Sequence, residues 1–274
     1  MIRIRPSKRT LILMITLSCS FWTGAFLLKR WYCDRSKSQG EKTIQQIISH
    51  PCSEYRLPHS LLTQLLNITP QTSLMTIDLK RCKERLQDAL VFEDIRLSKA
   101  PPSTLYISYR LRRPVAQLAA IDNIGVDQNG TLFPLYPFYT PLALPSLFLP
   151  LSPQPTVSEL QQETDCRKEM AIGLNLLSLL TPLCKKNGLS LTALDLSRST
   201  HSSFFRREII ATLSPKNEKD KLIYLRLNTK QPEQTAHTLS LLLPHIHTNK
   251  SGTIDLRFKG NALVSEELIR RSTS

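Results

Sequence analysis

The chain has 274 residues and a formal net charge of +14, from 36 lysines and arginines against 22 acidic residues. Apolar residues make up 41% and charged residues 21%, with 8 glycines and 18 prolines, which excludes a collagen-like, low-complexity or wholly disordered chain. The length suits one large domain or two of about 100 to 150 residues, each with its own core. The six cysteines include no Cys-x-x-Cys pair, so the sequence encodes neither a local zinc site nor a thioredoxin-like motif.

A stretch of 19 residues without a charge, residues 10–28, lies between basic flanks. As a helix it would extend about 28 Å, close to the roughly 30 Å of bilayer hydrocarbon. We expect a single transmembrane helix, with residues 1–9 as a cytoplasmic basic tail, residues 29–42 as a juxtamembrane linker and the rest of the chain outside. Since both flanks are basic, charge alone does not fix this orientation. The alternative is a cleaved signal peptide processed near Cys19, but the apolar stretch is longer than the usual core of such a signal.

Residues 43–113 have the pattern of a small α+β domain. Asp78 is placed to cap a helix in which Leu79, Cys82, Leu86 and Leu90 recur at a spacing of three and four. Residues 104–111 alternate strictly between apolar and polar side chains, as in a strand with one buried face. The expected order is a strand at 43–49, helices at 58–66 and 78–90, and strands at 95–100 and 104–111. We therefore expect a three-stranded sheet with two helices on one face.

Residues 114–264 indicate a second, larger α+β domain dominated by strands. The first strand is expected at 115–121, and Asn129-Gly130 predicts a tight hairpin because this pair supplies two positive φ angles. Seven prolines between 134 and 155 indicate a long loop, where strand pairing would lack N–H donors. A long helix is expected at 157–186, with Pro182 limiting its end and Asn187-Gly188 just beyond it as a stop. The remaining expected elements are strands at 191–196, 205–213 and 222–227, a helix at 232–243, and a last strand from 253–258 toward Val264, followed by a tail at 265–274.

No local signature of an enzyme or a cofactor site is present. The sequence has no Gly-x-Ser-x-Gly, Walker, Gly-x-Gly-x-x-Gly or His-Glu-x-x-His motif, which disfavours but does not exclude an enzyme with a dispersed site. His245 and His247 are the one close histidine pair and have no evident third metal ligand. Cys82 and Cys184 lie on apolar helical stripes, which indicates small core residues. We expect no cofactor and no metal.

The basic residues outside the N-terminal tail are spread along the chain. The positive electrostatic field of these residues could attract anionic lipid or acidic partners, although a simply solvated surface is the more ordinary interpretation. No pattern of a DNA- or RNA-binding module occurs, so we expect no nucleic-acid partner.

The last strand suggests a binding mode. If residues 253–264 lie at a sheet edge, their spare N–H and C=O groups can pair with an incoming extended segment. Lys259-Gly260-Asn261 would end or bend the strand and limit uncontrolled pairing. Ile254, Leu256 and Phe258 could also be core residues on one face, and both interpretations can hold together.

Several stretches, taken in order, resemble a known family. The unit at 43–113 resembles the polypeptide-transport-associated (POTRA) domain, and the continuation resembles the bacterial cell-division family FtsQ/DivIB. The stretches that carry this resemblance are Thr72-Ser73-Leu74-Met75-Thr76-Ile77-Asp78, Thr104 to Tyr109 with Arg112-Arg113-Pro114-Val115-Ala116, Ile121-Asp122 through Asn129-Gly130-Thr131-Leu132-Phe133, and Ile254-Asp255-Leu256-Arg257-Phe258. The sequence departs from the family pattern at Leu111, at His50-Pro51 and at Leu90.

The resemblance implies a function. Proteins of this family are non-catalytic, single-pass inner-membrane scaffolds of the divisome that influence septal peptidoglycan synthesis. Their C-terminal region receives the small coiled-coil protein FtsB and, through it, FtsL. The alternative is a POTRA-containing transport or assembly factor that handles extracytoplasmic polypeptides. Carried over residue by residue, the implied partner-binding positions are Ile254, Asp255, Leu256, Arg257, Phe258 and Gly260.

Overall fold

The computed structural model describes residues 26–30, 43–69, 71–150, 164–199, 203, 207–216, 218, 220–228, 231–247, 250–258 and 260–269. Most of the expected membrane segment at 10–28, the tail at 1–9, most of the linker at 29–42 and the end of the C-terminal tail lie outside these residues. Residues 26–30 are helical. Within the described ranges, no helix combines the length and the apolar character needed to cross a bilayer.

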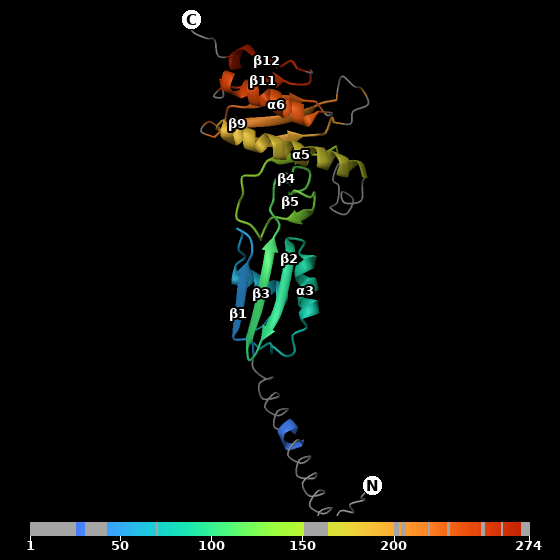
Figure 1. The fold of residues 1–274 in the computed structure, drawn as a ribbon, viewed down its shortest axis with the longest axis vertical. Helices are drawn as coiled ribbons and strands as arrows, with labels where there is room; N and C mark the ends of the chain where they lie inside the picture. Colours follow the sequence, from blue (N-terminus) through green and yellow to red (C-terminus); the bar gives the residue numbers. More distant parts are fainter. Residues whose placement is uncertain are drawn as a thin grey trace, which may run out of the picture. The chain divides into compact units, whose positions relative to one another are not determined.

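The chain forms two compact units, residues 1–88 with 94–110 and residues 89–93 with 111–274. Each unit contains its own sheet, one of three strands and one of nine (Figure 1). The α+β class is as predicted, and so is the division into one small and one larger sheet.

The smaller sheet has the strand order β1-β3-β2, with β1 parallel to β3. Leu105, Ile107 and Tyr109 of β3 are fully buried while Tyr106 between them is exposed, so helices cover one face and water reaches the other. Asp78 Oδ1 accepts a hydrogen bond from the Lys80 N–H at 2.9 Å, which confirms the predicted cap. The elements of this unit are β1 Gln46–Pro51, α2 His59–Leu66, α3 Leu79–Asp88, β2 Phe92–Ala100 and β3 Thr104–Leu111.

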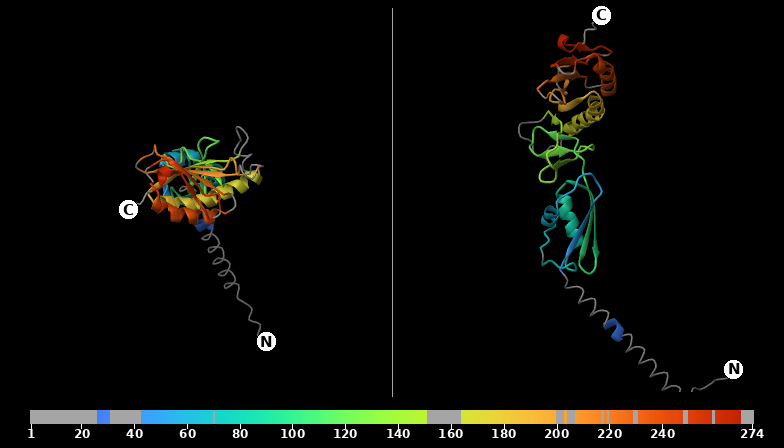
Figure 2. Two further views of the ribbon diagram at one scale, coloured as in Figure 1. Left: turned by 90° about the horizontal axis from the view of Figure 1, so that it is seen from above. Right: turned by 90° about the vertical axis from the view of Figure 1, so that its left-hand side faces the viewer.

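The larger sheet has the order β12-β11-β10-β9-β8-β7-β4-β5-β6. Helices α5 and α6 lie together on one face of it, as the two views of Figure 2 show. The strands are β4 Ala116–Leu118, β5 Ile124–Val126, β6 Leu132–Pro134, β7 Ser146–Phe148, β8 Leu189–Asp195, β9 Ile209–Pro215, β10 Ile223–Leu227, β11 Gly252–Asp255 and β12 Leu263–Val264. The helices are α5 Thr164–Lys186 and α6 Pro232–Leu242, with short 3-10 helices η2 Leu243–His245 and η3 Glu266–Leu268.

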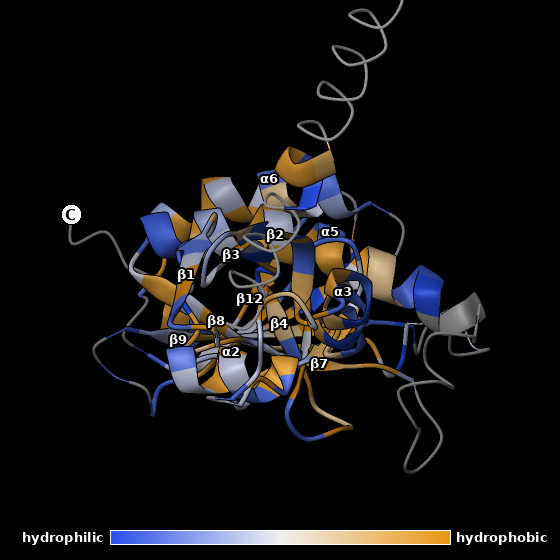
Figure 3. Cartoon of the chain, turned by 90° about the horizontal axis from the view of Figure 1, so that it is seen from below, coloured by the Kyte–Doolittle hydropathy of each residue, from blue (hydrophilic) through white to orange (hydrophobic). Residues whose placement is uncertain are grey.

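One apolar cluster joins the helices to the sheet. Leu176 and Leu180 of α5, Leu239 of α6 and the strand residues Ala211 and Leu225 are all fully buried in it. Hydrophobic and hydrophilic residues alternate along both helices in Figure 3, as expected of helices that bury one side. The predicted core cysteines, Cys82 and Cys184, are confirmed as buried.

The proline-rich segment contains a strand that the sequence analysis missed. β7 pairs in parallel with both β4 and β8 and is therefore interior to the sheet. Pro145 and Pro150 flank β7 rather than interrupt it, so neither removes a donor from its three residues. The prediction of a continuous loop from 134 to 155 is wrong at this point.

The hairpin after β5 is also wider than predicted. Val126 pairs with Leu132, which leaves residues 127–131 as a five-residue loop, and only Gly130 of the Asn-Gly pair has a positive φ, of 80°. Asp127 closes the loop instead, since its Oδ1 accepts hydrogen bonds from the Asn129 and Thr131 N–H groups, both at 2.9 Å. The structure therefore has a five-residue loop closed by Asp127 where the sequence predicted a two-residue turn.

Helix α5 ends at Lys186, which confirms the predicted end, and Pro182 lies inside the helix close to that end. A proline in the last turn removes only one backbone hydrogen bond. Gly188, part of the predicted stop just after the helix, has a φ of +72°, which suits a left-handed residue at a helix C-terminus. The predicted beginning of this helix, at 157–163, lies outside the described residues.

Candidate interaction site at the C-terminal edge of the larger sheet

The strand expected at the sheet edge is divided into two. β11 lies between β10, with which it is parallel, and β12, with which it is antiparallel. The prediction that residues from 253 onward form the edge is therefore wrong for β11, because its backbone has a neighbour on each side. At this end of the described sheet the edge strand is β12, which is only two residues long, and β6 is the edge strand at the other end.

The register shows which backbone groups of β12 point outward. The Ser265 N–H donates to the Thr253 carbonyl at 3.0 Å, which makes the neighbouring opposed pair, Ile254 and Val264, a non-hydrogen-bonded one. In such a pair the N–H and C=O groups of each residue point away from the partner strand. Val264 therefore offers one donor and one acceptor on the outer side of the sheet.

The predicted site residues fall into two groups by side chain. Ile254 and Leu256 are buried, at 0% and 5% exposure, in the core beneath α6, whereas Phe258 is 52% exposed. The core interpretation is therefore confirmed for the first two and wrong for Phe258. Leu263, which the sequence analysis did not single out, is 61% exposed on the edge strand itself.

Asp255 and Arg257 point to the face of the sheet opposite the core, because they alternate with Ile254 and Leu256. Arg257 Nη2 lies 2.7 Å from Asp255 Oδ2, and the Arg257 guanidinium also lies 5.9 Å from the centre of the Phe258 ring. Gly260 has a φ of +75°, in the turn that leads back to β12. The six predicted residues thus come together in one hairpin but play different structural parts.

Two residues from other strands complete a charge network on this face. Glu208, just before β9, has its Oε2 2.6 Å from Arg226 Nη2 and 3.6 Å from Arg257 Nη1, while its Oε1 lies 3.2 Å from Arg198 Nη1. Arg226 of β10 also reaches Asp255, at 3.3 Å. The carboxylates of Glu208 and Asp255 are nearly buried and are each held by at least two arginines, which is the condition under which buried charges are stable.

The network shifts the pKa of two of its members, Asp255 and Arg257. Burial alone would raise the pKa of Asp255, but hydrogen bonds from Arg257 and the charges of Arg257 and Arg226 outweigh it and lower that pKa below its usual value of 3.8. The hydrogen bonds to Asp255 raise the pKa of Arg257. Both groups therefore stay ionised across the neutral range, and this charged pair acts as a fixed brace.

Sequence reasoning missed Glu208 and Arg226, and it did not single out Leu263 and Val264 within the predicted edge at 253–264. The partners of Asp255 and Arg257 in the charge network depend on the pairing of β9, β10 and β11. No local pattern in the sequence gives that register.

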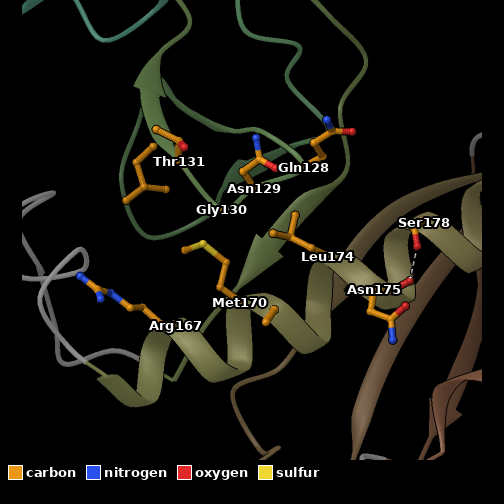
Figure 4. A pocket seen from close by; sticks show the side chains of 11 residues that line it. Gln128, Asn129, Gly130, Thr131, Arg167, Met170, Leu174, Asn175 and Ser178 are labelled. Carbon is orange, nitrogen blue, oxygen red and sulfur yellow. Dashed lines mark hydrogen bonds between the residues drawn. The ribbon is translucent and has the colours of Figure 1, made fainter. Parts of the chain in front are cut away.

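One cavity of the larger unit lies away from this edge. It has a volume of about 750 Å³ and lies between the 127–131 loop and α5, with Met170 and Leu174 toward the loop and Arg167 at one end (Figure 4). Arg167 is the one titratable side chain among its described lining residues. Across the residues that the structure describes, no group of three or more histidine, cysteine or acidic side chains is placed to hold a metal ion.

No protein-family model and no curated protein matches this sequence.

Proposed function

We propose that this protein is a non-catalytic scaffold of the bacterial divisome, of the FtsQ/DivIB type. In this proposal residues 10–28 anchor it in the inner membrane with the N-terminus in the cytoplasm, residues 43–113 are a POTRA domain and residues 114–264 are the β domain. The protein would gather at the division septum and recruit FtsB-like and FtsL-like single-pass proteins, and so influence septal peptidoglycan synthesis.

The observation that carries the proposal is the outer side of β12. Val264 offers an outward N–H and C=O there, and Leu263 beside it is 61% exposed. An extended segment of a partner can form main-chain hydrogen bonds with such an edge, while exposed side chains contribute specificity. The docking strand is therefore β12 rather than β11, with Phe258 and Gly260 beside it.

The architecture of each unit supports the same proposal. The smaller unit has the strand-helix-helix-strand-strand order on which the POTRA resemblance depends. The larger unit ends in a sheet edge braced by the Glu208, Asp255, Arg226 and Arg257 network, so a partner would meet a preformed surface.

A crosslinking experiment with the full chain in its native membranes tests the proposal. A photoreactive amino acid replaces Leu263, and the matched control carries it at His237, an exposed residue of α6. We expect Leu263 to yield a crosslink to a small single-pass coiled-coil protein and His237 to yield none. Equal crosslinks from both positions, or products that contain only other classes of protein, would contradict the proposal.

A further inference from the structure

A second open stretch of strand lies inside the larger sheet. β8 pairs with β9 along most of its length, from Leu189 to Asp195. On its other side β7 pairs only with Ala193 to Asp195. In the described sheet, residues 189–191 therefore have no strand neighbour on the β7 side.

The register gives the direction of the backbone groups in this stretch. The Lys216 N–H donates to the Gly188 carbonyl at 3.1 Å, so Leu189 and Pro215 form a non-hydrogen-bonded pair. Leu191, two residues further, belongs to the same class. Both residues direct their N–H and C=O groups away from β9, toward the side that β7 leaves open.

A groove lies along this open side. It has a volume of about 670 Å³, within the range of roughly 300 to 1,000 Å³ typical of binding pockets. Leu174 and Leu177 of α5, Leu144 before β7, and Leu189 and Leu191 of β8 supply apolar lining. The groove therefore combines an apolar wall with an unpaired strand edge.

The charges that line the groove are all positive. They are Arg113, Lys185 and Lys216, each exposed, and none forms an ion pair with another described residue. No acidic side chain is among the described lining residues. The groove thus complements a ligand that is acidic as well as partly apolar.

We propose that this groove binds an extended, acidic segment of a partner protein, which adds a short strand to β8 at Leu189 and Leu191. Main-chain hydrogen bonds would hold the segment, its apolar side chains would face α5, and its carboxylates would meet Arg113, Lys185 and Lys216. An anionic lipid headgroup would match the cations but would leave the alternating donors and acceptors of β8 unused, so a peptide is the better fit. This site is separate from the β12 edge and does not depend on the proposed function.

Hydrogen–deuterium exchange on the full chain in zwitterionic detergent tests this proposal. The probe is the peptide acetyl-Val-Glu-Val-Glu-Val-amide, and the control peptide carries Lys in place of Glu. We expect the acidic peptide to slow exchange of the Leu189 and Leu191 amides and the basic peptide to leave them unchanged. Vesicles of phosphatidylglycerol, added without peptide, provide the lipid comparison.

Charge-reversal variants show whether the groove itself is responsible. Lys185→Glu and Lys216→Glu should each weaken binding of the acidic peptide about fivefold to tenfold, since rim charges contribute modestly to affinity. Lys186→Glu makes the same change on an exposed neighbour in α5 that does not line the groove, and should change the affinity less than twofold. An equal effect of all three variants, no protection of Leu189 and Leu191 by the peptide, or protection by the vesicles alone would overturn the proposal.

Discussion

Arg226 of β10 lies directly opposite Asp255 of β11 in the parallel register, with its Nη1 3.3 Å from Asp255 Oδ2. The same arginine holds Glu208 at 2.6 Å on its other side. An interior strand is thereby tied by charge to the hairpin that forms the sheet edge. The geometry of that edge depends on these contacts as well as on the apolar core beneath them.

Replacing Asp255 with Asn should destabilise the fold by about 1.5 to 3 kcal/mol, the usual range for hydrogen bonds to charged groups. The physical reason is that Arg257 and Arg226 lose their counter-charge where Asp255 is 7% exposed. Chemical denaturation measures the change. Asp122→Asn, at an exposed position, is the control and should lie within about 0.5 kcal/mol of the original chain.

The same carboxylate predicts a pH dependence. Because the pKa of Asp255 is lowered in the folded state, its contribution to stability is fully present above the unfolded value of 3.8 and is lost as pH falls through the lower folded value. The original chain should therefore lose more stability than Asp255→Asn below about pH 4. If the free energy of unfolding of the two proteins falls equally with pH in that range, Asp255 does not stabilise the fold as an ionised group.

Asp127→Ala should loosen the 127–131 loop. Asp127 accepts two backbone hydrogen bonds within the loop, and its Oδ2 lies 2.9 Å from Arg112 Nη1, where Asp127 is 4% exposed. Loss of all three contacts should cost about 2 to 4 kcal/mol. The readout is the free energy of unfolding together with faster amide exchange at Thr131. An unchanged exchange rate there would show that the side chain does not close the loop.

The cysteines should differ sharply in reactivity. Burial raises the pKa of the Cys184 thiol to about 12 and also raises the pKa of Cys82, whereas Cys52 is exposed. Since the thiolate is the reactive form, iodoacetamide at pH 8 should label Cys52 in the folded protein and label the other two only after denaturation. Peptide mapping by mass spectrometry distinguishes them. Rapid native labelling of Cys184 would contradict its place in the core.

The sequence predicted the elements whose pattern is local. The alternation from Thr104 to Leu111 gave the bounds of β3, and Asp78 was identified as a cap from its position before an apolar stripe. In both cases the buried face or the cap depends on residues within a few positions of one another. Such patterns need no knowledge of the tertiary structure.

The features that were missed depend on distant neighbours. β7 is three residues long and forms because it can pair with β4 on one side and with β8 on the other. Its own proline-rich sequence does not indicate this pairing. The loop at 127–131 depends on Arg112 as well as on Asp127. The edge was predicted as one strand over residues 253–264, whereas the structure divides it into β11 and a two-residue β12 that has almost no strand signal of its own.

The central claim is that the outward backbone of β12 receives a partner chain, and one substitution tests it most directly. Val264→Pro removes the outward N–H, and it leaves the Ser265 N–H that bonds Thr253 in place. Val264→Thr keeps both the N–H and the branched shape and serves as the control. In native membranes, with equal protein levels and unchanged denaturation curves, the proline variant should recover at least about tenfold less of the FtsB-like partner while the threonine variant recovers a normal amount, since one lost main-chain bond at a short edge removes much of its affinity. Normal recovery with the folded proline variant would contradict the account.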